Sequence, residues 1–184
     1  WLFLLLVPAI AMRLWSEEYK GGTVELLFTM PVSVGEAVLG KFLAAWAVLA
    51  VSLALTFPAV VTVCVLGKPD YGIIATGYLA SLLLAGTYLA IGSFTSSMTR
   101  NQIVSFIVSL VVCLLLILIS HPSISDFFTS WSPVWLVDVM SRAGVIEHFD
   151  NIKKGVIDLR DLLYFASVIA AFLAATGITL YSKR

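Results

Sequence analysis

The sequence predicts an all-α, polytopic membrane protein, a bundle of helices that cross a lipid bilayer. Hydrophobic residues make up 60% of the 184 positions and charged residues 12%, whereas soluble domains carry about 25% charged residues. The mean hydropathy is +1.03. The charges are also clustered, and they leave four uncharged stretches that can each cross a hydrocarbon core of about 30 Å as a helix. Around these stretches we place four complete spans, over residues 36–66, 72–98, 103–119 and 162–181.

Residues 1–12 are apolar as well, but they are too few to cross a bilayer. They contain no basic residue that could form the start of a secretory signal peptide. We therefore interpret residues 1–12 as the end of a truncated span, and residues 1–184 as a single transmembrane domain.

A first polar segment covers residues 13–41. The pair Gly21-Gly22 predicts a break between two short helices in this segment. Ser33 and Glu36 have the spacing of a capping box, in which each side chain bonds to the backbone N–H of the other residue. A new helix should therefore begin at Ser33 and continue into the membrane.

A second polar segment covers residues 120–161. It interleaves Phe127, Phe128, Trp131 and Trp135 with polar residues. Aromatic rings favour the headgroup region of a bilayer, so the segment should lie at the membrane interface. A substrate-binding role for these aromatic residues is the alternative.

The number of crossings assigns the polar segments to two sides of the membrane. Residues 13–41, 99–102 and 182–184 should share one side, and residues 67–70 and 120–161 the other. The basic residues are divided too evenly between the sides for the positive-inside rule to orient the chain.

Several function classes are disfavoured. The four uncharged stretches offer no Asp, Glu, His, Lys or Arg, the residues that ion-coupled carriers and intramembrane hydrolases need within the membrane. His121 and His148 lack the spacing of metal ligands, and Cys64 and Cys113 lie within predicted spans, where a thiol acts as a small hydrophobic group. The net charge of zero attracts no nucleic acid. We expect no catalytic, cofactor-binding or metal site in this chain.

The first complete span holds two notable local patterns. Residues Gly35–Phe42 fit the spacing G-x-x-x-x-G-K of a phosphate-binding loop, but no strand precedes them and the Ser or Thr that should follow Lys41 is absent. We interpret this match as coincidence. Pro58 predicts a kink in the same span.

Small residues recur at four-residue spacing in two spans, a pattern that lets helix backbones approach closely. We interpret these stripes as packing within the chain, with a substrate path as the alternative; they could equally contribute to a dimer seam. The pairs Ser81/Ala85, Gly86/Ala90 and Gly92/Ser96 lie in one span, and the sets Ala166/Ala170/Ala174 and Ser167/Ala171/Ala175 lie in the last.

Two segments resemble a known family, the type 2 ABC-transporter permeases. Residues Arg13–Ser33 resemble the family's cytoplasmic coupling segment and keep the pattern E-x-x-x-G-T-x-E-x-L-x-x-x-P-x-S, which starts at Glu18. Residues His148–Phe165 are similar to the segment before the last helix in the gliding-motility-associated branch. The resemblance implies a six-helix, exporter-type permease in which the first helix and part of the second are missing here. Gly21 departs from the family, whose members often have a larger polar residue there.

The resemblance also implies roles and partners. Residues 13–41 would be cytoplasmic, residues 120–161 extracytoplasmic, and the chain a multi-pass protein of the bacterial inner membrane. Two permease copies would work with two ATPase subunits, which bind ATP and Mg. A membrane-anchored accessory subunit with a periplasmic domain would bind outside. The residues implied for ATPase coupling are Glu17, Glu18, Gly22, Thr23, Glu25, Leu26 and Leu27, with a second contact at Arg100, Asn101 and Gln102; those implied for the outer partner are Trp131, Trp135, His148, Phe149, Arg160 and Asp161.

Two alternatives remain open from the sequence. One is a membrane scaffold that transports nothing and holds a partner through its outer aromatic segment. The other is a carrier or channel that is independent of ions.

Overall fold

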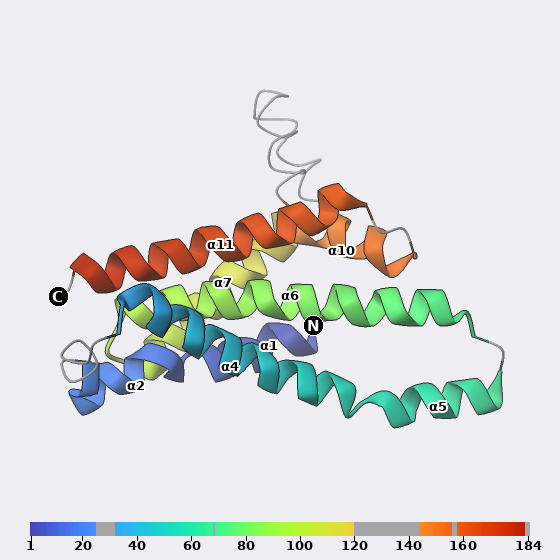
Figure 1. Cartoon of the computed structure of the whole chain (residues 1–184), viewed down its shortest axis with the longest axis horizontal. Helices are drawn as coiled ribbons and strands as arrows, with labels where there is room; N and C mark the ends of the chain where they lie inside the picture. The colour runs from blue at the N-terminus through green and yellow to red at the C-terminus, as the bar shows by residue number, and fades with distance from the viewer. Residues whose placement is uncertain (25–31, 68, 120–143, 156–157, 183–184) are drawn as a thin grey trace.

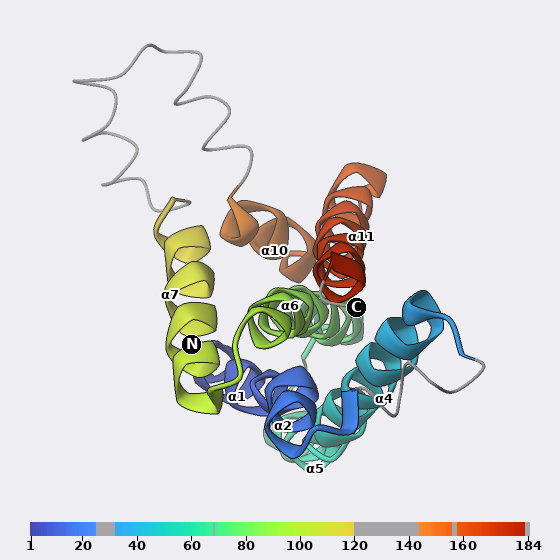
Figure 2. The ribbon, with the colours of Figure 1, turned by 90° about the vertical axis from the view of Figure 1, so that its left-hand side faces the viewer.

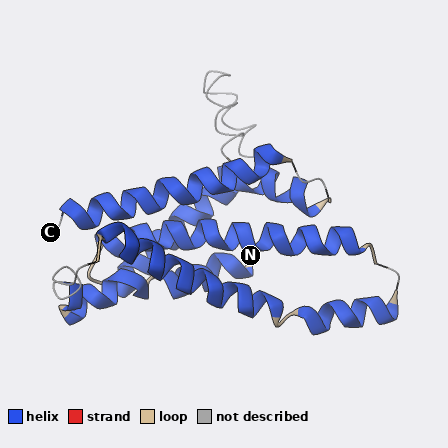
Figure 3. Ribbon diagram, in the orientation of Figure 1, coloured by secondary structure: helices blue, strands red, loops and turns tan. Residues whose placement is uncertain are grey.

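The computed structural model describes residues 1–24, 32–67, 69–119, 144–155 and 158–182, and every regular element in these residues is a helix (Figure 3). Four apolar stretches are long enough to span a membrane: Val34–Leu66, Tyr71–Met98, Gln102–Ile119 and Leu159–Ser182. The predicted all-α membrane bundle is therefore confirmed. The helices are α1 (Leu2–Ala11), α2 (Arg13–Gly21), α4 (Val34–Ala54), α5 (Phe57–Leu66), α6 (Tyr71–Met98), α7 (Gln102–Ile119), α10 (Val145–Lys153) and α11 (Leu159–Ser182).

The long helix α6 lies at the centre of the bundle. Viewed from one end, α7, α1, α2, α4, α11 and α10 surround it (Figure 2), and each of them packs against it. The stretch Ala85–Ser93 of α6 is buried throughout. Its members include Leu89 and Ile91, which have no exposed surface. A helix buried on all sides must be apolar or small on all sides, and this part of α6 is both.

Small residues allow the close approaches around α6. A Cβ atom placed on Gly92 would lie 2.3 Å from Ala11 Cβ, and one on Gly86 would lie 3.0 Å from the ring nitrogen of Trp46. These two glycines pack within the chain, as the stripe on this span predicts. The stripe on α11 behaves differently. Its residues Ala166, Ala170 and Ala174 are exposed, so no other helix of the described chain covers them.

Local signals set the helix ends. The Ser33 N–H donates to Glu36 Oε2 at 2.8 Å and the Glu36 N–H donates to Ser33 Oγ at 3.3 Å, which is the predicted capping box. Gly22 ends α2 with a φ of 69°, a left-handed conformation that glycine adopts without strain. Asp70 caps α6, because its Oδ1 accepts from the Gly72 N–H at 2.8 Å.

The predicted kink at Pro58 is a full break between two helices. Helix α4 ends at Ala54 and α5 starts at Phe57, with Pro58 in its first turn, where a proline costs no hydrogen bond. Helix α5 has no buried residue. It diverges from the rest of the bundle (Figure 1).

The two ends of the bundle differ in what they carry. Helix α2, the α6–α7 turn and the C-terminal end of α11 lie at one end (Figure 1). Helix α10 lies at the other end, beside the start of α11.

The Gly92 contact gives a test of the packing. Gly92→Ala should force α1 away from α6 and lower the free energy of unfolding by about 1–3 kcal/mol, the usual cost of overpacking a core. The measurement is thermal unfolding of the purified protein in detergent. Gly77→Ala on the same helix is the control and should be neutral or stabilising, since a Cβ there meets no atom within 4 Å. Equal effects of the two substitutions would contradict the packing described for α1.

Candidate functional site

Helix α2 is fixed to α6 by a serine that accepts hydrogen bonds from the first backbone N–H groups of α2. The first N–H groups of any helix lack partners within the helix. Here the N–H groups of Trp15 and Ser16 both donate to Ser96 Oγ at 3.0 Å, and that hydroxyl donates to the Met12 carbonyl at 2.9 Å. The start of α2 is thus capped by a side chain of a membrane helix.

The Trp15 side chain adds a second attachment to α6. The indole has no exposed surface, and its Nε1–H donates to Ser93 Oγ at 3.1 Å. A fully buried indole combines a large apolar contact with one satisfied donor. Ser93 and Ser96 are one helical turn apart, so α2 is held at two successive levels of α6.

Lys41 of α4 holds α2 from the other side. Its Nζ donates to Glu18 Oε1 at 2.8 Å and to the Leu14 carbonyl at 2.9 Å, and it lies 4.6 Å from the centroid of the Trp15 ring. This is the lysine of the motif that resembles a phosphate-binding loop. Its position inside α4, engaged with α2, supports the interpretation of that match as coincidence. We call Trp15, Glu18, Lys41, Ser93 and Ser96 the α2 junction.

Electrostatics at the α2 junction favour the ionised form of Glu18. Hydrogen bonds from Lys41 and from the Thr23 hydroxyl hold the pKa of this carboxyl below its ordinary value. Burial raises the pKa of the neighbouring Tyr19, and the positive charge of Arg100 opposes that shift. Helix α2 packs against both α6 and α7, and the α6–α7 turn lies at the same end of the bundle as α2 (Figure 1).

The residues implied for coupling lie at the end of α2, in the α6–α7 turn, and outside the described residues. At the end of α2, Glu17 is exposed, whereas Glu18, Gly22 and Thr23 lie in or beside the α2 junction. In the α6–α7 turn, Arg100 and Asn101 are exposed and Gln102 is half-buried, and Asn101 Oδ1 caps α7 by accepting from the Ile103 N–H at 3.0 Å. The remaining three, Glu25, Leu26 and Leu27, lie outside the described residues.

Only Glu18 among the members of the junction has a coupling role in the sequence interpretation. That interpretation gives Ser96 a packing role alone, and it gives Trp15, Ser93 and Lys41 none. The signals that point to Trp15, Ser93 and Ser96 are a tryptophan among charged residues and two serines on a span where the small-residue stripe runs. The sequence alone does not show that these residues meet, because about 80 positions separate them.

A second polar pair lies at the opposite end of the bundle. His148 Nδ1 and Asp161 Oδ1 are 2.6 Å apart, with 12% and 3% of their side-chain surfaces exposed. The His148 ring also stacks on Tyr164 at 4.1 Å between centroids. The second oxygen of Asp161 is buried and has no hydrogen-bond partner among the described residues.

Two of the residues implied for an outer partner thus contact each other. Asp161 is buried and His148 is half-buried, and Asp161 lies in the first turn of α11, which begins at Leu159, whereas the predicted span begins at residue 162. An acidic side chain is therefore buried at the edge of the last span. Asp158 explains the earlier start, because its Oδ1 caps the helix by accepting from the Arg160 N–H at 3.1 Å.

The other residues implied for an outer partner are placed as follows. Arg160 is exposed and Phe149 is half-buried. Trp131 and Trp135 lie outside the described residues.

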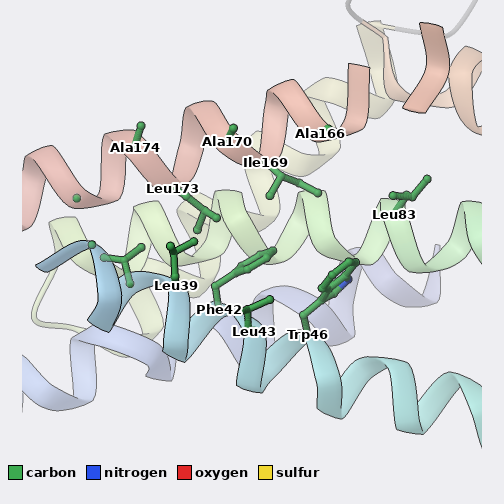
Figure 4. Close-up of a pocket in the computed structure, with 13 residues that line it drawn as sticks. Leu39, Phe42, Leu43, Trp46, Leu83, Ala166, Ile169, Ala170, Leu173 and Ala174 are labelled. Atoms are coloured by element: carbon green, nitrogen blue, oxygen red, sulfur yellow. The ribbon is translucent and has the colours of Figure 1, made fainter. Parts of the chain in front are cut away.

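An apolar groove of 620 Å³ runs between α4 and α11 (Figure 4). The alanine stripe Ala166, Ala170 and Ala174 forms one side, and Phe42 and Trp46 lie on the other. The Trp46 ring N–H is satisfied by the Leu82 carbonyl at 3.0 Å. The lining offers no charged group, so the groove has the character of a lipid-facing surface.

A family model described as ABC-2 family transporter protein matches residues 2–132. The chain belongs to the ABC-2 family. The match covers α1, α2 and the helices α4 to α7, and so includes the whole α2 junction. A search among curated protein sequences gives no match. As an ABC-2 protein the chain is a multi-pass membrane subunit, the permease component of an ABC transporter, and its family works with an ABC ATPase.

The contribution of the Glu18–Lys41 ion pair in the α2 junction to stability should depend on pH. Because the pKa of Glu18 in the fold lies below its ordinary value of 4.5, the stabilisation is complete above pH 4.5 and is lost as the pH falls through the lower, folded value. Glu18→Gln should lower the unfolding temperature at pH 7, and its difference from the wild type should vanish in acid. Thermal unfolding in detergent over a pH series measures this.

Two further variants control that experiment. Glu17→Gln changes the exposed neighbouring carboxyl and should have little effect at any pH. Adding Glu18→Gln to a Lys41→Met background should cost less than it does alone, since the partner is already gone. Full additivity would show that the ion pair contributes nothing.

Breaking the His148–Asp161 pair should cost more stability than replacing both of its members. His148→Phe leaves a buried carboxylate without its partner and should cost about 3–5 kcal/mol of unfolding free energy, whereas His148→Phe with Asp161→Leu should recover most of this loss. Hydrogen exchange of α10 and thermal unfolding measure both. Arg160→Gln, at an exposed neighbour, should stay within about 0.5 kcal/mol of the wild type. A double variant as unstable as the single one would contradict the pairing.

Proposed function

We propose that this chain is the permease subunit that receives force from a separate ABC ATPase through α2, and that the α2 junction passes this force to the membrane helices. The ATPase binds ATP and Mg, and the permease converts its movement into export or into mechanical work outside the membrane. The observation that carries the proposal is the double attachment of α2 to α4 and α6.

The attachments suit the transmission of movement. Ser96 bonds to three backbone groups of the α1–α2 corner, and Lys41 bonds to a backbone carbonyl of α2 as well as to Glu18. Hydrogen bonds to the backbone hold the helix itself rather than a flexible side chain. A displacement of α2 must therefore move α4 and α6 or break buried hydrogen bonds, each of which costs about 1–3 kcal/mol to leave unmade.

The outward surface of α2 suits a docking partner. Arg13, Glu17 and Lys20 are exposed. A shallow pocket of 420 Å³ between α2 and α4 is lined by Arg13, Glu17 and Glu18 together with apolar residues of α4. Charged side chains of both signs around a small pocket favour a protein partner with complementary charge.

The proposed assembly holds two copies of the permease and two ATPases in a bacterial inner membrane, with α2 and the α6–α7 turn on the cytoplasmic side. Glu25, Leu26 and Leu27 complete the docking segment. On the outer side, a membrane-anchored accessory subunit of the gliding-motility-associated type binds the segment 120–161. The similarity of His148–Phe165 to that branch supports this partner.

Two substitutions separate docking from force transmission. Glu17→Lys should weaken ATPase binding roughly tenfold, which is about 1.4 kcal/mol, because it reverses an exposed charge. Trp15→Leu should leave the ATPase bound but abolish the stimulation of ATP turnover by substrate, because α2 loses its attachment to Ser93. Co-purification from detergent and ATP turnover in vesicles measure the two effects.

Trp1→Leu is the matched control, since that indole is 82% exposed. It should behave as the wild type in both assays. Full stimulation of turnover in Trp15→Leu would refute the path through the α2 junction. A wild-type preparation that binds no ATPase would refute the proposed function altogether, and a stoichiometric partner without nucleotide-binding motifs would identify a scaffold instead.

A further inference from the structure

A second groove lies between α5, α6 and α10, at the end of the bundle opposite to α2. Its volume is 460 Å³, within the range of about 300–1,000 Å³ that is usual for small-molecule sites. Most of the lining is aliphatic, from Leu53, Ala59, Val60 and Val63 on the α4–α5 side and from Ile73 and Ile74 on α6. Helix α5 has no buried residue, so this apolar wall is accessible from the bilayer.

A hydroxyl pair closes the deep end of the groove. Thr56 Oγ1 and the Tyr78 hydroxyl are 2.7 Å apart, and Thr56 Oγ1 also donates to the Leu53 carbonyl at 2.6 Å. This hydrogen bond connects Thr56, which lies between α4 and α5, to Tyr78 of α6. Because the two hydroxyls bond to each other, neither is left without a partner against an apolar chain.

Lys153 lies at the opposite, shallow end. A Cβ atom placed on Gly155, just after α10, would be 3.7 Å from Ile73, which is in the first turn of α6. The end of α10 is therefore level with the start of α6, where the helix leaves the membrane. Tyr78 is five residues further along α6, about 7.5 Å deeper at 1.5 Å per residue.

The charge of Lys153 is not neutralised within the described chain. It takes part in neither of the ion pairs found there, and none of the residues that line the groove is acidic. The groove therefore combines an apolar wall at hydrocarbon depth with one basic group at headgroup depth. The His148–Asp161 pair fixes this arrangement, because it holds α10 with Phe149 and Lys153 along the groove.

We propose that this groove binds a bilayer lipid with an anionic headgroup. One acyl chain lies between α5 and α6, and the acidic headgroup lies at Lys153. An uncharged headgroup would leave the lysine without a counter-ion, and a water-soluble anion would make no use of the apolar part of the groove. The inference depends on the membrane-spanning bundle and not on coupling to an ATPase.

Lipid retention tests the proposal. The permease, with any ATPase that co-purifies, is placed in nanodiscs of equimolar phosphatidylglycerol and phosphatidylcholine, extracted into detergent, and analysed for retained lipid by mass spectrometry. The wild type should retain phosphatidylglycerol in excess. Lys153→Gln should reduce that excess roughly five-fold, the effect of removing one basic group from an anionic lipid surface.

Lys154→Gln is the matched control. This lysine is adjacent and exposed but does not line the groove, so the excess should persist. Gly77→Leu fills the groove from α6, where a Cβ meets no atom within 4 Å, and should reduce retention of both lipids while the charge is kept. An equal loss in Lys153→Gln and Lys154→Gln, no excess in the wild type, or full retention in Gly77→Leu would overturn the proposal. None of these readouts uses ATP, so they stand apart from the test of the proposed function.

Discussion

The bilayer offers no hydrogen-bond partners, and this constraint accounts for the polar contacts of the bundle. Every polar group at membrane depth has to find a partner within the protein. Several hydroxyls on α6 and α11 do so within their own helix: Thr76, Thr87, Thr95 and Thr176 each donate to a backbone carbonyl one turn earlier. Ser105 and Ser109 of α7 are the exceptions, since neither hydroxyl has a partner in the described part of the chain.

The same constraint turns the start of α2 into a structural anchor. A helix that begins beside the membrane has backbone N–H groups that water does not reach, and Ser96 satisfies two of them. Trp15 and Lys41 then complete a contact in which each polar atom has its partner. A fully satisfied polar network of this kind has one geometry rather than many, which rigidifies the corner between α1 and α2. Movement of α2 is proposed to pass into the bundle for this reason.

Local features of the fold could be predicted from the sequence because they depend on neighbouring residues. The capping box at Ser33, the left-handed glycine that ends α2 and the break at Pro58 are all of this kind. The contacts of Trp15 with Ser93 and of His148 with Asp161 depend on which helix faces lie together, and periodicity does not determine that. The alanine stripe of α11 shows the same limit, because small residues permit close packing but do not require it.

The two ends of the bundle use polar pairs in different ways. At the α2 end, several hydrogen bonds and an ion pair converge on one short helix, and the neighbouring part of α6 is buried on all sides. At the other end, Val145 and Ile152 of α10 pack against α6 and α11 beside the His148–Asp161 pair, and two hydroxyls connect the start of α5 to α6. Helix α5 itself has no buried residue, so few buried contacts must change when this helix shifts. If force enters at α2 as proposed, α5 is therefore the element of the described chain that can move at the lowest cost.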